Sequence, residues 1–116
     1  MVEIKSSSKE LNKVEKYMMT ASNQGTSMKE VPDNAELQVK IWAIVNRTNE
    51  DTGETVELLS IFDGKAVYMA QSKTFLKSFN DIASIMDGED YKIRKISGTT
   101  RSGREYIDCQ LVIENM

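Results

Sequence analysis

Residues 37–45 decide the fold class, and they read LQVKIWAIV. Every second side chain from Leu37 to Val45 is apolar, and the alternate positions begin with two polar residues. An apolar period of two is typical of a β-strand that buries one of its faces in a core. We therefore predict a first strand here, with Trp42 on the polar parity beside Lys40.

A second and a third strand follow as a hairpin. Residues 55–62 are rich in apolar side chains, and residues 65–70 continue the β pattern after Asp63-Gly64. The dipeptide Asp-Gly is one of the strongest signals for a two-residue hairpin turn. If the turn has two residues, Phe62 and Lys65 flank it and point to the same face of the sheet.

The sequence then predicts one helix and two more strands. Apolar residues recur at helical spacing over residues 72–86, where Ser72 is the expected N-cap and Gly88 the expected stop. Residues 91–96 and 105–113 return to the pattern of strands. The helix therefore separates the first three strands from the last two.

The order strand, strand, strand, helix, strand, strand is that of the OB-fold, a five-stranded Greek-key barrel with its helix between strands three and four. We predict such a mainly β domain over residues 35–116; an open sheet with one covering helix is the alternative. Residues 1–34 are predicted to be an N-terminal arm. Residues 20–34 of the arm look like a loop, and residues 9–19 like a short amphipathic helix. The apolar stripe of that helix consists of Leu11, Val14, Tyr17 and Met18.

The composition excludes several classes of protein. With 116 residues, of which 40% are hydrophobic and 28% charged, the chain fits one globular domain. No apolar stretch approaches the roughly 20 residues of a membrane span. The N-terminus lacks the apolar middle region of a secretory signal, so we expect a cytosolic protein without a membrane partner.

The residue types also narrow the chemistry. The chain has no histidine, which removes the usual general base and the Ser-His and Cys-His nucleophiles. Its single cysteine, Cys109, cannot form an internal disulfide or complete a metal cluster, and its six glycines form no phosphate-binding loop. We therefore expect a binding module without enzymatic activity, cofactor or metal ion.

One hairpin is basic although the chain is acidic overall. The net charge is −3, yet residues 91–105 contain five basic residues and one acidic residue, Glu105. A local basic patch favours contact with phosphates. Exposed edge strands also carry cations that discourage edge-to-edge pairing, so a solvated edge is the alternative. The five basic residues are Lys92, Arg94, Lys95, Arg101 and Arg104.

Aromatic side chains on outward parities add surfaces for stacking. Tyr106 directly follows the basic loop, Trp42 lies beside Lys40, and Phe62 lies beside the predicted turn. Bases of single strands stack on such rings next to cations. Tyr68 shares the parity of core residues and is a further candidate, while Trp42 has an alternative role as the surface on which the N-terminal helix packs. The predicted nucleic-acid site is Lys40, Trp42, Phe62, Lys65, Tyr68, Lys92, Arg94, Arg101, Arg104 and Tyr106.

Residues 96–109, ISGTTRSGREYIDC, resemble the final hairpin of small single-stranded DNA-binding proteins of tailed phages that infect Gram-positive bacteria. The resemblance implies an OB-fold protein that binds and protects single-stranded DNA, largely independent of sequence, during phage DNA replication or recombination in the cytoplasm of the infected cell. The resemblance is compatible with two kinds of protein partner: phage replication or recombination proteins, and further copies of the chain. Bacterial single-stranded DNA-binding proteins usually end in an acidic tail, which residues 113–116 do not form. Shorter similarities to the phage proteins lie at residues 17–20, 29–31, 58–62 and 72–75.

A function of a different class fits the same sequence. A phage-encoded protein-interaction module would dock through Trp42, Ile44 and the N-terminal helix and would not bind nucleic acid. A carboxylate-dependent hydrolase is disfavoured, because the sequence offers no convergent cluster of acidic residues.

Overall fold

Two β-sheets make up most of the structure, a computed structural model that describes residues 2–21, 25–87 and 89–113. Two α-helices and one short 3-10 helix accompany the sheets: α1 (Lys13–Thr20), η2 (Met28–Glu30) and α2 (Lys73–Ile85). The strands of the described residues are β1 (Val2–Ser7), β2 (Gly25–Ser27), β3 (Glu36–Val39), β4 (Ile41–Thr48), β5 (Thr55–Phe62), β6 (Val67–Ala70), β7 (Tyr91–Thr99) and β8 (Glu105–Leu111).

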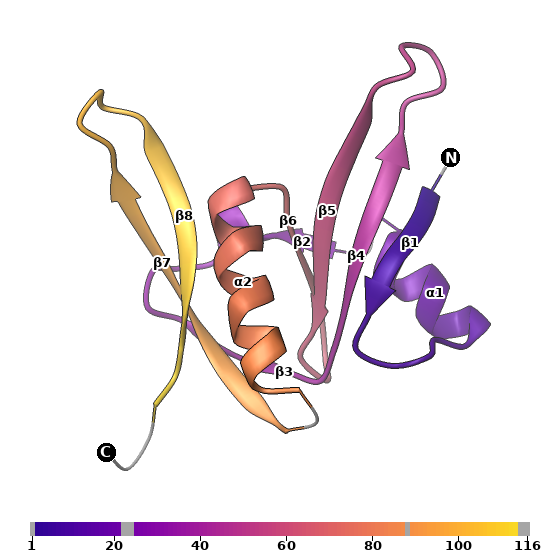
Figure 1. Ribbon diagram of the computed structural model, residues 1–116, viewed down its shortest axis with the longest axis horizontal. Helices are drawn as coiled ribbons and strands as arrows, with labels where there is room; N and C mark the ends of the chain where they lie inside the picture. Colours follow the sequence, from indigo (N-terminus) through magenta and orange to yellow (C-terminus); the bar gives the residue numbers. More distant parts are fainter. Residues whose placement is uncertain (1, 22–24, 88, 114–116) are drawn as a thin grey trace.

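The larger sheet has the strand order β1-β4-β5-β6-β2, and the smaller sheet has the order β3-β7-β8. All neighbouring strands are antiparallel except β2 and β6, which are parallel. The two sheets diverge from their connection at Lys40, and α2 covers the angle between them (Figure 1). In the described part of the chain β8 pairs only with β7, so the sheets do not close into a barrel. The predicted mainly β fold is confirmed, but a closed five-stranded barrel is not found.

Lys40 divides the first predicted strand into two. Side chains of one parity face one core before Lys40 and the other core after it. β3 ends at Val39 and β4 begins at Ile41, while the Lys40 backbone N–H donates to the carbonyl oxygen of Phe62 at 2.9 Å. A single residue outside the ladder shifts the alternation of side chains by one. Val39 therefore packs in the same core as Trp42. The prediction that Trp42 lies on an outward face is wrong for this reason.

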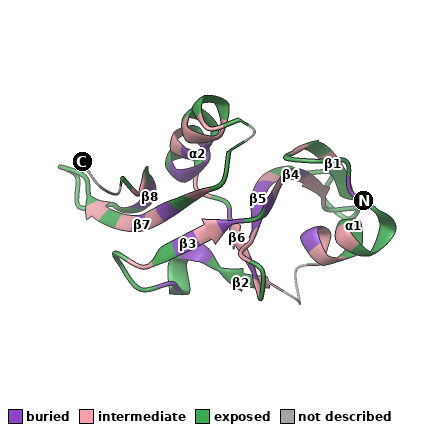
Figure 2. Ribbon diagram, turned by 90° about the horizontal axis from the view of Figure 1, so that it is seen from below, coloured by how far each residue is buried: buried purple, intermediate pink, exposed green. Residues whose placement is uncertain are grey.

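The main core lies between the two sheets and α2. Phe75 and Phe79 of α2 are fully buried there, against residues of both sheets such as Leu59 and Ile93. Burying these large side chains away from water stabilises the packing of α2 on both sheets. Figure 2 shows buried residues in purple on α2, β5 and β7.

A second core lies on the other face of the larger sheet and is covered by the N-terminal arm. Leu11 and Met19 of the arm are buried against Ala43 and Leu58 of the sheet. The Ser60 hydroxyl, also buried, donates to the Met19 carbonyl at 2.6 Å. The arm thus contributes a strand to each edge of the larger sheet and a helix to its outer face.

The helix of the arm is shorter than predicted. Asn12 caps it, because the Asn12 side chain accepts from the Glu15 N–H at 2.8 Å and the Glu15 carboxylate accepts from the Asn12 N–H at 3.0 Å. This start turns Met19 towards the sheet and leaves Val14 and Tyr17 76% and 62% exposed. The predicted apolar stripe is therefore wrong at these two residues.

α2 begins where the sequence predicts. Ser72 caps α2 as predicted, since its hydroxyl accepts from the Phe75 N–H at 3.2 Å. The helix ends at Ile85 with Met86 as its C-cap, whereas the predicted stop, Gly88, lies outside the described residues. None of the helices in the described ranges is long and apolar enough to cross a membrane.

Candidate nucleic-acid interface

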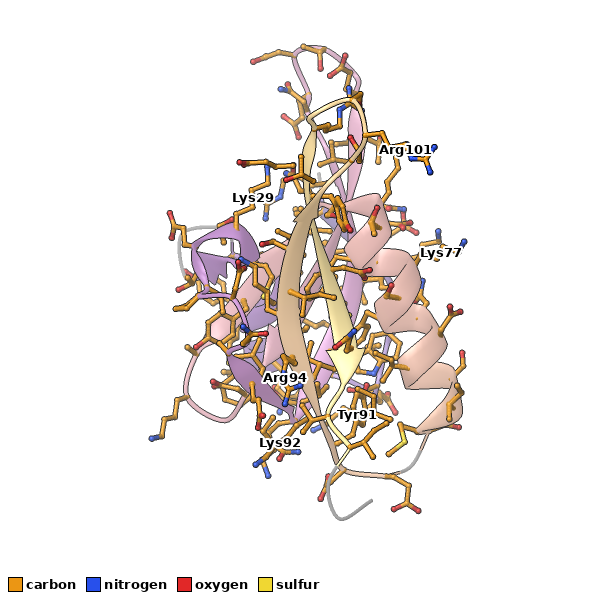
Figure 3. All side chains as sticks on the ribbon, turned by 90° about the vertical axis from the view of Figure 1, so that its left-hand side faces the viewer. Lys29, Lys77, Tyr91, Lys92, Arg94 and Arg101 are labelled. Atoms are coloured by element: carbon orange, nitrogen blue, oxygen red, sulfur yellow. The ribbon has the colours of Figure 1, made fainter. Side chains whose placement is uncertain are left out.

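A cleft of about 1200 Å³ lies beside the β7–β8 hairpin. Its walls come from the hairpin, from residues 29–33 and from the connection between β6 and α2 at residues 71–74. Arg104 and Tyr106 of the predicted site line this cleft, together with Lys29. In Figure 3, Lys29 and Arg101 lie towards the hairpin end of β7, and Lys92 and Arg94 lie towards its other end.

The loop at the end of the hairpin has a defined conformation. Thr100 closes it, because its N–H donates to the Arg104 carbonyl at 2.8 Å and its hydroxyl accepts from the Arg104 N–H at 3.1 Å. Gly103 occupies the left-handed region at φ +86°, where a residue with a Cβ would be strained. This loop places Arg104 in the cleft wall and leaves Arg101 exposed outside it.

Tyr106 lies across the neighbouring strand at Gly98. The two residues are cross-strand partners, and a Cβ built on Gly98 would lie only 2.5 Å from Tyr106 Oη and 2.6 Å from Cζ. The outer end of the phenol ring therefore rests on the Gly98 backbone, while 38% of Tyr106 stays exposed. Both residues line the cleft, so one face of the ring is supported and the rest is open to a ligand.

Lys95 does not belong to the basic surface, although it lies in the basic hairpin. It is only 4% exposed, and its Nζ donates to the Val31 carbonyl at 2.8 Å and to Asp33 Oδ1 at 3.1 Å. The hydrogen bond from the Ser97 hydroxyl, and then that from Lys95, hold the pKa of Asp33 below its usual value. Lys95 thus attaches residues 31–33 to β7 and shapes the cleft wall.

The other predicted cations lie away from the cleft. Arg94 forms an ion pair with Glu36 at 3.0 Å on the outer face of the smaller sheet. Lys92 lines a separate cavity near the C-terminal end of β8. Lys40 and Lys65 are both exposed. Lys65 lies in the β5–β6 connection, and Lys40 lies close to it, since a Cβ built on Gly64 would be 3.8 Å from Lys40 Cγ.

The β5–β6 connection has four residues instead of the two predicted. Phe62 pairs with Val67, and the Asp63 carboxylate accepts from the N–H groups of Lys65 and Ala66, both at 2.8 Å. This side-chain turn lengthens the loop. Phe62 and Lys65 therefore do not flank a two-residue turn.

The remaining aromatic candidates pack into the two cores. Trp42 is half-buried and meets Phe79 edge to face, with the ring centroids 5.8 Å apart. Tyr68 pairs with Ile61 and packs against the main core, as its parity predicts, and Phe62 packs against the second core. The N-terminal helix also packs in the second core, so Trp42 is not the surface on which it rests.

The structure therefore brings together only part of the predicted site. Arg104 and Tyr106 share the cleft, and Arg101 lies on the adjoining loop. Sequence reasoning did not identify Lys29, which lies in a segment expected to be loop. The only signal for it was the similarity of residues 29–31 to the phage proteins.

The described residues contain no arrangement of three or more His, Cys, Asp or Glu side chains that could hold a metal ion. Cys109 is buried and its Sγ lies 3.8 Å from the Phe75 carbonyl oxygen. Burial, and to a smaller extent the charge of Asp108, raises the pKa of Cys109 to about 12. The thiol is therefore protonated at neutral pH and is not an activated nucleophile.

Comparison with known proteins adds nothing to these contacts. No family model, no curated protein and no solved structure matches the chain. Its function has to be inferred from its own residues.

Proposed function

We propose that the protein is an OB-fold protein that binds single-stranded DNA without strong sequence preference. The antiparallel pairs β4–β5, β5–β6, β3–β7 and β7–β8 support the fold, with β3 and β4 as one first strand shared by both sheets. These pairs, with α2 between the third and fourth of these strands, support a partly open Greek-key arrangement of the kind that OB-folds have. The opening lies between β6 and β8, where β2 pairs with β6 instead.

The observation that carries the proposal is the cleft with Arg104 and Tyr106 in its wall. OB-folds hold oligonucleotides with the loop between their last two strands, which here is the loop that bears Arg101 and Arg104. An exposed ring beside cations is the arrangement that binds single strands, because any base can stack on it. Tyr106 supplies the ring, and the two arginines supply the charges.

The charge of the cleft sets an expectation for affinity. Lys95 and Asp33 neutralise each other, which leaves Lys29 and Arg104 against Glu30 and Glu105. With Arg101 added, about three phosphate contacts are available, which corresponds to a salt slope of about −2 at roughly −0.7 per contact. We expect moderate affinity in which stacking has a large share.

Binding of this kind has a biological consequence without any catalysis. A protein that binds only unpaired DNA protects exposed strands and melts hairpins by mass action. The resemblance of residues 96–109 to phage proteins supports a role in phage DNA replication or recombination, in the cytoplasm of an infected bacterium.

Titration of fluorescently labelled oligo(dT) at several salt concentrations tests the proposal. The variant Arg101→Glu/Arg104→Glu should bind more weakly by roughly an order of magnitude at low salt, with a flatter salt slope. The control Lys13→Glu/Lys16→Glu makes the same charge change at the same spacing on α1, away from the cleft, and should bind like the parent. Absence of binding by the parent, or equal losses in both variants, would overturn the proposal.

A second candidate, a protein-interaction module, is favoured by the exposed apolar side chains of Val14 and Tyr17 on α1. Such a module would not dock through Ile44, which is buried, or through Trp42, which packs on α2. This candidate would be established if the parent protein does not bind oligo(dT) but binds a protein partner, and if Tyr17→Ser weakens the binding of that partner.

A further inference from the structure

A second, smaller cavity of about 340 Å³ adjoins the cleft. It lies over the larger sheet and is lined by residues of β2, β4, β5 and β6. Lys29, Gln71 and Ile107 line both hollows, so the cleft and the cavity lie side by side. A DNA strand that leaves the cleft past Lys29 would reach the cavity.

The charge of the cavity differs from that of the cleft. Among the described residues, its lining includes two cations, Lys29 and Arg47, and no carboxylate, whereas the cleft is lined by three acidic residues. Leu58 and Met69 form apolar parts of the wall. Two cations in a recess whose own lining has no carboxylate favour an anion there, although Lys29 also lies near Glu30 of the cleft.

Arg47 lines the cavity, and its side chain is held in place by the protein. Its position is set by the sheet, where β4 pairs it with Val2 on one side and Val56 on the other. One terminal nitrogen of its guanidinium donates to the Thr20 carbonyl oxygen. Its buried Nε has no partner in the described structure. Because Nε is buried, a phosphate in the cavity would meet the terminal nitrogens of a guanidinium that the ladder and the Thr20 carbonyl hold in place.

We propose that this cavity is a phosphate-binding site formed by Arg47 and Lys29. The inference rests on the proposed function, because the phosphate in question is that of a DNA strand that continues from Arg104 past Lys29. The same chemistry also accepts a free phosphate ion. Arg47 was not among the residues predicted from the sequence.

Two variants and a control test the site. Arg47→Met keeps the length of the stem but removes every donor. Lys29→Gln removes the other cation at an exposed residue whose side chain forms no ion pair with the described residues, so that it folds even if Arg47→Met does not. Lys16→Gln, exposed on α1 and outside both hollows, is the control.

The first measurement uses labelled oligo(dT). Each of Arg47→Met and Lys29→Gln should weaken binding and reduce the magnitude of the salt slope by roughly 0.7, and Lys16→Gln should change neither. The second measurement uses inorganic phosphate. It should raise the melting temperature of the parent more than sodium chloride does at equal ionic strength, and both site variants should lose this difference.

The two measurements separate this inference from the proposed function. If the parent binds oligo(dT) and neither site variant changes the affinity, the slope or the phosphate effect, the phosphate site is overturned and the proposed function stands. If phosphate stabilises the parent through Arg47 and Lys29 but oligo(dT) does not bind, the site is one for free phosphate and the proposed function falls. If the site variants reduce the salt slope of oligo(dT) binding but free phosphate does not raise the melting temperature of the parent, the site binds phosphates of the DNA backbone only.

Discussion

At the scale of single residues, Gly98 controls the position of Tyr106. The strand backbone at Gly98 has no left-handed φ, so the backbone itself accepts alanine, but the added methyl would meet the phenol ring at 2.5 Å. The ring is the far end of a movable side chain and would swing away. We therefore expect Gly98→Ala to change the free energy of unfolding by less than about 1 kcal/mol.

The same substitution should weaken DNA binding through the ring. If Tyr106 stacks on a base, Gly98→Ala should lose on the order of 1 to 3 kcal/mol of oligo(dT) affinity with an unchanged salt slope, because stacking releases no counterions. Tyr106→Phe should bind like the parent. The double variant Gly98→Ala/Tyr106→Ala should bind no more weakly than Tyr106→Ala alone. Parent-like binding by Gly98→Ala would show that the ring does not need its support.

At the scale of elements, α1 is attached to the sheet by one face only. Met19 is fully buried in the second core, whereas Val14 on the same helix is 76% exposed. Met19→Ala should therefore lower the free energy of unfolding by about 2 to 5 kcal/mol. Val14→Ala should change it by less than about 0.5 kcal/mol. Urea unfolding followed by circular dichroism measures both, and equal effects would contradict the packing of the arm.

At the scale of the whole molecule, alkali should destabilise the fold through the main core. Burial raises the pKa of Cys109 from its ordinary value of 9.0 to about 12, and that of Tyr91 from 10.0 to about 12. Above the ordinary value the unfolded chain releases the thiol proton while the folded chain keeps it. The stabilisation is therefore complete below about pH 9 and declines as the pH rises towards 12.

A comparison with Cys109→Ala isolates the thiol. Between about pH 8 and pH 10.5, the free energy of unfolding of the parent should fall more steeply than that of the variant, because the variant has no thiol to ionise. Urea titrations at each pH supply the two curves. Parallel curves would mean that the Cys109 thiol is as accessible in the folded state as in the unfolded chain.

Local features of this fold could be predicted because their causes lie within a few residues. The cap at Ser72, the helical spacing that follows it and the alternation of the strands all depend on near neighbours in the chain. For the same reason the hairpin that bears Arg104 and Tyr106 was expected at its observed place. Local patterns of residue types thus predicted the mainly β class, the order of the elements after residue 36 and one side of the cleft, but not the strands β1 and β2 of the arm.

Which faces and which distant residues meet depends on how the elements pack in three dimensions. The break at Lys40 exchanges the two faces of the first strand, so Trp42 enters the main core, and alternation cannot reveal a shift of one residue. Lys95 is buried and pairs with Asp33, which is 62 positions away in the chain, so it adds no charge to the surface. Lys29 and Arg47 come to one cavity because the arm folds back over the larger sheet. Such pairings depend on the packing of whole elements, which no local pattern of residue types encodes.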